Sequence, residues 1–255
     1  PLNGILGLAE LIGNQPLQPT QIQHLQLLAR SGERLLRLVN DVLDMSQVEA
    51  GAVRLRQQRF DLSELLDDLI DLHGHPARSK GLELHLDAPL MGTTWFRADA
   101  DRVRQVLVNL LGNAIKFTEE GQVTLRCRVL EPSGTTRSIR FEVEDTGIGI
   151  SEERADHLFE RFSQVDDSNT RAFGGTGLGL ALVKSLALEM NGAVGVESKP
   201  GEGSTFWAEF PLCEAPENAP DADFKVKDWL LATGRSETGQ DDHTVDQDLN
   251  EVLAG

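Results

Sequence analysis

The chain has 255 residues, enough for two small domains or one large one. Its formal net charge of −17 makes it a poor candidate for binding a nucleic-acid backbone or an anionic membrane surface. The two cysteines, Cys127 and Cys213, have no metal-ligand or redox spacing, so we expect a reducing compartment and no disulfide framework. No apolar run approaches the ~18 residues of a membrane span. A polyanionic ligand would have to be bound locally, by backbone N–H groups, a few basic side chains and a metal ion.

Apolar residues recur at helical spacing over residues 1–15 and again over residues 20–50, with a proline-bearing turn between them. The second stretch has an a/d seam about four heptads long and a wider apolar stripe beside it. A stripe this wide suits a four-helix bundle, to which one hairpin supplies only two helices. We therefore predict a helical hairpin that forms a homodimer through residues 1–50. The alternative is an intrachain helix pair packed on a domain.

The pattern then changes to a mixture of strands and helices. We predict extended segments at residues 53–60, 83–87, 94–98, 121–130, 137–144, 193–198 and 204–211, and helices at residues 61–81, 99–118, 152–162 and 178–190. This order predicts an α+β fold in which helices cover one face of a mixed, mostly antiparallel sheet. Residues 1–52 and 53–212 are expected to form two domains.

The last segment, residues 213–255, has eleven acidic and three basic residues, a net charge of −8. This composition, rich in Ala, Pro, Asp and Glu, predicts a disordered tail or linker.

Two asparagines, Asn109 and Asn113, are four residues apart in the segment QVLVNLLGNAIKF, so they share one face of the predicted helix. Amides on the buried side of an apolar helix need hydrogen-bond partners. A nucleotide phosphate with Mg²⁺ would supply them, and bonding to neighbouring backbone is the alternative. Lys116, one turn later, adds a positive charge for a phosphate.

Three glycine-bearing segments follow this helix. In DTGIG (residues 145–149), a carboxylate ends a strand and two glycines let the backbone approach a flat ligand, although an ordinary capped turn would have the same composition. GGTGLGL (residues 174–180) opens a helix, where backbone N–H groups can bind an anion. Its spacing is neither that of a Walker A loop nor that of a Rossmann fingerprint. GEGSTF (residues 201–206) by itself indicates a hairpin turn.

In order and spacing, these segments together with FERF (residues 159–162) resemble the N, G1, F, G2 and G3 boxes of sensor histidine kinases. The resemblance covers about residues 97–212, and these kinases share a wider family with gyrase, the Hsp90 chaperones and MutL. It implies an α/β sandwich of the Bergerat type that binds ATP with Mg²⁺. The ATP-binding residues it implies are Asn109, Asn113, Lys116, Asp145, Gly147, Gly149, Phe159, Phe162, Gly175, Gly177, Leu178, Gly179 and Thr205.

The resemblance also implies a role for each group of residues. Asn113 would be the Mg²⁺ ligand, and Asp145 would accept the adenine amino group. Asn109 and Lys116 would be the catalytic pair. Asn109 stands where ATP-hydrolysing relatives place a glutamate, and an amide cannot act as general base for water, which favours a kinase over an ATPase. The two phenylalanines of FERF would anchor a mobile lid at residues 163–176, and Thr205 would close the pocket floor.

The segments PLNGILGLAELI and DVLDMSQVEAG resemble the dimerisation and phosphoacceptor hairpin of hybrid-type kinases. The family motif His-Glu-Leu-Arg-Thr-Pro-Leu-Asn matches from Pro1 onward, so the acceptor histidine is expected five residues before Pro1 and is absent from this sequence. The resemblance implies phosphoryl transfer to that histidine and then to a receiver aspartate of a response regulator, in cis or in trans. It also implies the cytoplasmic portion of a parent anchored in the inner membrane. An ATP-binding dimeric regulatory module without kinase activity is the alternative.

Overall fold

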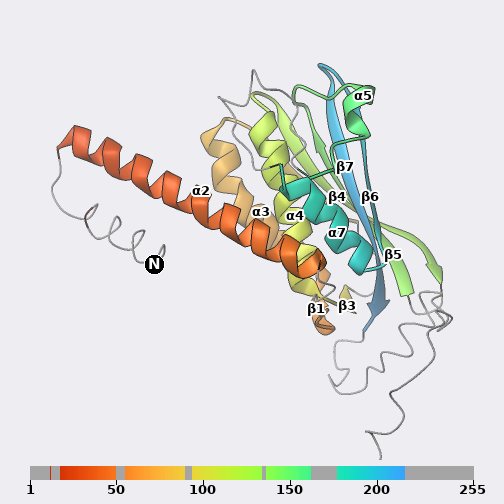
Figure 1. The fold of residues 1–255 in the computed structure, drawn as a ribbon. Helices are drawn as coiled ribbons and strands as arrows, with labels where there is room; N and C mark the ends of the chain where they lie inside the picture. The colour runs from red at the N-terminus through yellow and green to blue at the C-terminus, as the bar shows by residue number, and fades with distance from the viewer. Residues whose placement is uncertain are drawn as a thin grey trace, which may run out of the picture.

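The computed structural model describes residues 12, 18–49, 55–89, 94–133, 136–161 and 177–215. A long helix, α2 (Pro19–Glu49), extends from a domain in which helices cover one face of a sheet (Figure 1). The covering helices are α3 (Leu62–Ser79), α4 (Ala100–Phe117) and α7 (Gly179–Glu189). Nearly all of the predicted helix at residues 1–15 lies outside the described residues, as do residues 216–255. The order of a helical region followed by an α/β domain agrees with the prediction.

Helices α3 and α4 begin where the sequence places N-cap aspartates. Asp61 Oδ1 accepts hydrogen bonds from the backbone N–H and the hydroxyl of Ser63 at 2.9 and 2.7 Å. Asp99 Oδ1 accepts from the backbone N–H of Arg102 at 3.1 Å. The two bonds from backbone N–H groups each satisfy a donor that the first turn of a helix leaves without an intrahelical partner.

The helix predicted at residues 152–162 is shorter in the structure, and this part of the prediction was wrong. Helix α5 spans only Glu152–Ala155, and the chain continues to residue 161 in turns. Four residues without a side-chain cap are too few for a helix to be stable by itself. Leu158 and Phe159 pack against the core, so tertiary contacts decide the path of the chain here.

The described strands form a seven-stranded sheet in the order β1-β3-β7-β5-β4-β2, with β6 also paired to β7. Five of these six pairs are antiparallel, and only β2–β4 is parallel. The mixed, mostly antiparallel sheet is therefore confirmed. The strands are β1 (Gln58–Asp61), β2 (Glu83–Asp87), β3 (Trp95–Ala98), β4 (Gln122–Ser133), β5 (Thr136–Asp145), β6 (Ala193–Lys199) and β7 (Gly203–Glu214).

Strand β7 continues past residue 212, where we expected the domain to end. Cys213 pairs with Arg97, and Ala215 donates its backbone N–H to the carbonyl of Trp95 at 2.9 Å. Both Cys213 and Ala215 are buried. The acidic composition of residues 213–255 concealed the three residues, Cys213, Glu214 and Ala215, that pair with β3.

The core lies between the helices and the inner face of the sheet. Helix α4 occupies its centre, with Leu107, Leu110 and Leu111 almost completely buried against sheet residues such as Phe141 and Phe210. Because α4 also carries Asn109, Asn113 and Lys116, packing of the core fixes where these polar side chains stand.

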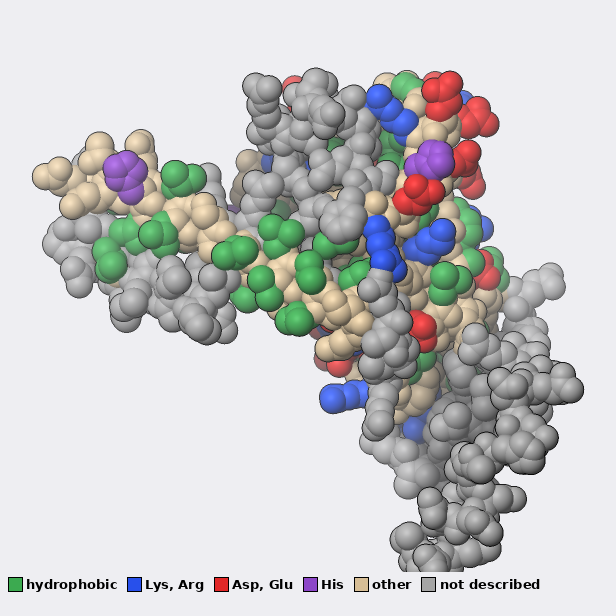
Figure 2. All heavy atoms as spheres, viewed as in Figure 1, with side chains coloured by type: hydrophobic (Ala, Val, Ile, Leu, Met, Phe, Trp, Pro, Cys, Tyr) green, Lys and Arg blue, Asp and Glu red, His purple; other side chains and the backbone are tan. Residues whose placement is uncertain are grey.

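Helix α2 contacts the domain near its C-terminal end. Met45 is buried there, and Gln105 Nε2 of α4 donates to Asp44 Oδ2 at 2.6 Å. Farther along α2 the structure exposes a row of large apolar side chains (Figure 2), which comprises Ile22, Leu27, Leu28, Leu35, Val39, Val42 and Leu43. Among the described residues, no helix has the length and apolar character needed to span a bilayer.

Candidate nucleotide-binding site

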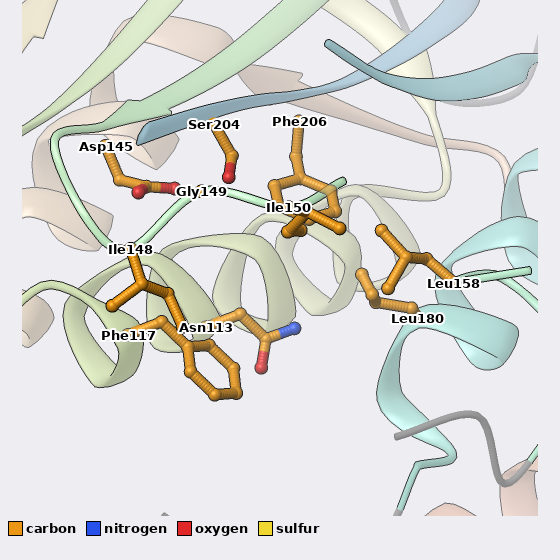
Figure 3. A pocket seen from close by; sticks show the side chains of 10 residues that line it. All are labelled: Asn113, Phe117, Asp145, Ile148, Gly149, Ile150, Leu158, Leu180, Ser204 and Phe206. Carbon is orange, nitrogen blue, oxygen red and sulfur yellow. The ribbon is translucent and has the colours of Figure 1, made fainter. Parts of the chain in front are cut away.

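A pocket lies between α4, the loop that follows β5 and the first residues of β7 (Figure 3). Its cavity volume is about 50 Å³. Apolar side chains make most of the wall and a few polar groups interrupt it, an arrangement suited to a flat ligand with defined hydrogen-bonding edges. The lining residues are Asn113, Phe117, Asp145, Ile148, Gly149, Ile150, Leu158, Leu180, Ser204 and Phe206.

Asp145 provides a buried carboxylate at the end of β5. It is 5% exposed, and its Oδ1 accepts a hydrogen bond from the backbone N–H of Gly147 at 2.8 Å. Burial raises the pKa of this carboxyl above its ordinary value, while backbone hydrogen bonds from Gly147 and Ser204 counteract the rise and Glu144 adds to it. The pocket therefore contains a hydrogen-bond acceptor that is largely withdrawn from water.

The DTGIG loop packs backbone to backbone against the hairpin between β6 and β7. Gly149 has φ of +65°, and a Cβ at this position would stand 1.9 Å from the carbonyl oxygen of Lys199. Gly203 has φ of +113°, and its Cβ would stand 2.0 Å from the carbonyl oxygen of Asp145. Only glycine fits at both positions. The GEGSTF segment is therefore a hairpin turn that also supports the pocket loop.

Two serines that the sequence did not single out connect these backbones. Ser198 Oγ accepts from the backbone N–H of Ile150 and donates to the carbonyl of Gly203, both at 2.8 Å. Ser204 Oγ lies 2.9 Å from Ser198 Oγ. A sequence signal existed, because the two serines flank the KPGEG turn and pair directly across the predicted hairpin.

Thr205, predicted to close the pocket floor, does not line the pocket. Its neighbours Ser204 and Phe206 both do. The hydroxyl that reaches the pocket is that of Ser204, one position before the predicted Thr205. Because successive side chains of a strand point to opposite faces, a shift of one position changes the face.

On α4, the side chains of Asn113 and Asn109 have different surroundings. Asn113 lines the pocket, and its amide makes no side-chain hydrogen bond within the described part of the chain. Asn109 Nδ2 donates to the backbone carbonyl of Gln105 at 3.0 Å, the neighbouring-backbone arrangement that the sequence left open. Asn109 Oδ1 would lie 3.0 Å from a Cβ on Gly179, so the first turn of α7 approaches this amide closely. Lys116 Nζ lies 4.3 Å from the centre of the Phe117 ring.

The glycine-rich segment is described only from Gly177, which has φ of +69°. Leu178 is buried at the N-cap position of α7, and Gly179 begins the helix. Phe159 packs with its ring 6.4 Å from that of Phe206 in an edge-on arrangement. Phe162 and Gly175, which the sequence also assigned to the site, lie outside the described residues.

Within the ranges that the structure describes, no three histidine, cysteine, aspartate or glutamate side chains come together as a metal site. His73, part of the sequence HGHP, is buried with Nδ1 2.9 Å from the carbonyl oxygen of Leu69. One buried carboxylate, one amide without a side-chain hydrogen bond among the described residues and a helix N-terminus suit an aromatic ligand that carries anionic groups.

Two models of known protein families match parts of this chain. Residues 98–214 match the family model of histidine kinase-, DNA gyrase B- and HSP90-like ATPases, and residues 1–51 match that of the His kinase A (phospho-acceptor) domain. The pocket and strands β4 to β7 thus lie within the first of these two matches. The chain therefore contains domains of the phospho-acceptor and ATPase families, and over most of its length it is similar to proteins named sensor histidine kinases.

The chain is 41% identical over 222 residues to the sensor protein GacS of Pseudomonas syringae pv. syringae, covering 86% of this chain and 24% of that protein. It is 42% identical over 212 residues to the signal transduction histidine-protein kinase BarA of Escherichia coli K12, covering 83% and 23%. The crystal structure of full-length ShkA in complex with AMPPNP superposes with a TM-score of 0.70 at 39% identity, over 84% of this chain and 44% of that one. The chain therefore spans about a quarter of the length of the curated relatives it matches.

Proposed function

We propose that the pocket binds Mg²⁺-ATP and that the chain is the catalytic part of a two-component histidine kinase. The observation that carries this proposal is the buried carboxylate of Asp145 in an otherwise apolar pocket. A ligand amino group that donates to this carboxylate would compensate for its lost hydration, and the adenine ring would fill the apolar space. Gly147 and Gly149 would let the base approach the loop. The AMPPNP bound in the ShkA structure supports the choice of ligand.

The phosphate groups would lie between α4 and the N-terminus of α7. Backbone N–H groups at Gly177 and Gly179, together with the Lys116 ammonium, would provide positive charge there. Asn113 fits a role as Mg²⁺ ligand, because Mg²⁺ prefers oxygen donors and this amide has no other side-chain partner among the described residues. Mg²⁺ held by Asn113 would supply charge neutralisation to the phosphates.

The proposed reaction is transfer of the γ-phosphoryl group to a histidine expected upstream of Pro1, and then to a receiver aspartate. Positioning and charge stabilisation would provide most of the catalysis. Asn109 would contribute without activating water, since an amide is not a general base, so hydrolysis would be disfavoured.

The first experiment measures Mg²⁺-ATP binding to this chain by calorimetry and phosphorylation by radiolabelled ATP. We expect binding and no phosphoryl adduct. A chain extended upstream through the expected histidine should give an acid-labile, base-stable adduct. An adduct on the present chain would contradict the upstream acceptor, and binding without transfer in the extended protein would support the regulatory module instead.

The same proposal includes the domain layout and the partners. Residues 1–52 would form the dimerisation and phosphoacceptor hairpin, the catalytic domain would follow from residue 53, and the acidic C-terminal segment would lead to or accompany a receiver domain. The parent would be anchored in the inner membrane with this portion in the cytoplasm.

Dimerisation would use the apolar row on α2, where Leu35 and Val42 are one heptad apart and about half exposed. Sedimentation should give a dimer for the unchanged chain and a monomer for Leu35→Glu with Val42→Glu. The matched control is Gln23→Glu, which adds a charge to an exposed position of the same helix and should leave the dimer intact. A double variant that remains dimeric would rule out this interface.

A further inference from the structure

Lys80 contacts a helix other than its own. It is the C-cap residue of α3, and its backbone N–H donates to the carbonyl of Ala77 at 3.0 Å. Its ammonium Nζ lies 2.7 Å from the carbonyl oxygen of Ile115, 2.9 Å from that of Lys116 and 3.1 Å from that of Thr118. These three carbonyls belong to the last turn of α4 and to its C-cap residue.

The last turn of an α-helix leaves four carbonyls without intrahelical partners. In α4, Thr118 bonds the carbonyl of Ala114 through its backbone N–H at 3.1 Å and its hydroxyl at 2.8 Å. Lys80 bonds the next two carbonyls along the helix. A cation is also favourable at this end of the helix, which carries the negative pole of the helix dipole.

The backbone on both sides of Lys80 is fixed, so its ammonium is presented from a rigid position. Gly81 closes the end of α3 with φ of +77°. The backbone N–H of Glu83 then donates to the carbonyl of Gly121 at 3.0 Å, at the start of the parallel pairing between β2 and β4. The side chain thus connects the α3–β2 corner to the end of α4.

That end of α4 is also a wall of the pocket. The Phe117 side chain lines the pocket, and its carbonyl oxygen would be 2.6 Å from a Cβ on Gly147. Gly147 in turn donates to Asp145 Oδ1. A shift of the last turn of α4 would therefore move both the Phe117 wall and the loop that orients Asp145.

We propose that Lys80 is a positioning residue for the nucleotide pocket, acting through the last turn of α4 without touching the ligand. This inference rests on the proposed function of the pocket, since it concerns how tightly ATP is held. Replacing the ammonium with an apolar group would leave the carbonyls of Ile115 and Lys116 to water, and the end of α4 would fray beside the adenine position.

The test compares Lys80→Met, which keeps the length of the side chain, with Lys80→Arg, which keeps charge and donors. ATP affinity is measured by calorimetry well below the melting temperature of every variant. We expect the dissociation constant to rise about five- to tenfold in Lys80→Met, the size of effect that charge-assisted hydrogen bonds produce. Lys80→Arg should restore it to within about twofold.

Two controls separate positioning from a general loss of stability. Val129→Ala trims a partly buried side chain on β4, so it should lower the melting temperature and leave ATP affinity unchanged. Lys184→Met removes an exposed cation on α7 and should change neither quantity appreciably.

Unchanged affinity in Lys80→Met, no rescue by Lys80→Arg, or an equal loss of affinity in Val129→Ala would each overturn the positioning role. In all three cases the unchanged chain still binds ATP, so the proposed function survives. If the unchanged chain does not bind Mg²⁺-ATP, the proposed function fails and this inference falls with it.

Discussion

The backbone N–H of Gly147 donates to Oδ1 of Asp145 at 2.8 Å, and a Cβ on residue 147 would stand only 2.7 Å from the same oxygen. The loop that follows β5 therefore both orients the carboxylate and requires glycine beside it. Asp145 provides the hydrogen-bond acceptor, and Gly147, two residues later, determines where that acceptor points.

Asp145→Asn should weaken ATP binding while leaving the fold as stable as before or slightly more stable. The change removes the negative charge that would accept the adenine amino group, and we expect affinity to fall at least about tenfold. Calorimetry with Mg²⁺-ATP measures this directly. Asp67→Asn, on the exposed side of α3, is the matched control.

The same variant tests the pKa of Asp145. Because burial raises the folded-state pKa above the ordinary 3.8, the unfolded carboxyl ionises first as pH rises. The contribution of Asp145 to stability should therefore fall as pH rises from below 3.8 through the folded-state pKa, and be constant above it. Urea unfolding across this range should show a steeper loss of stability for the unchanged chain than for Asp145→Asn. Parallel curves would contradict the raised pKa.

Gly149→Ala and Gly201→Ala form a matched pair. Both glycines have positive φ, +65° and +80°, but a Cβ at Gly149 would meet the Lys199 carbonyl, whereas a Cβ at Gly201 would have no atom within 4 Å. Gly201→Ala should cost only the left-handed backbone penalty, about 1–2 kcal/mol. Gly149→Ala should cost clearly more and abolish ATP binding, because the hairpin must move. If urea unfolding gives the same loss of unfolding free energy for both variants, the hairpin moves at little energetic cost.

Asn113→Ala should remove the dependence of ATP affinity on Mg²⁺. If Asn113 Oδ1 is the metal ligand, ATP affinity with Mg²⁺ and with EDTA should become nearly equal in the variant. Asn113→Asp retains an oxygen ligand and should retain the dependence on Mg²⁺. A dependence on Mg²⁺ that survives in Asn113→Ala would place the metal on other groups.

Cys127 should react with thiol reagents only when the domain opens, and ATP should slow that reaction. The side chain is 1% exposed, and burial raises the pKa of its thiol to about 12. Ligand at one hundred times its dissociation constant adds about 2.7 kcal/mol of stability, which corresponds to a rate about one hundred times lower. The measurement uses Cys213→Ser to isolate one thiol. A rate unaffected by bound ATP would mean that β4 opens locally.

Much of the fold could be predicted from the sequence, because period-two patterns mark the strands and apolar residues at helical spacing mark the longer helices. The short α5 could not, since packing of Leu158 and Phe159 overrides local propensity there. The motifs predicted part of the candidate site, since Asn113, Asp145 and Gly149 line one pocket. Ser198 could be found only from the hairpin register.

The role of Lys80 lay beyond sequence reasoning for a different reason. The local sequence around a lysine at the end of a helix is the same whether its side chain faces water or the end of another helix. Its partners are 35 or more positions away in the chain, and nothing in the local pattern indicates that α3 and α4 end side by side.

The position of β7 in the sheet has a consequence for biosynthesis. This strand pairs with β3, β5 and β6, so it joins the β1–β3 pair to the β2–β4–β5 group. It is also the last of the described strands in chain order. While a ribosome is making this protein, the two parts of the sheet have no shared hydrogen bonds until residues 203–214 have emerged from the exit tunnel. The nascent domain must therefore wait for its final strand before it can close, and until then its apolar surfaces depend on protection from the cell.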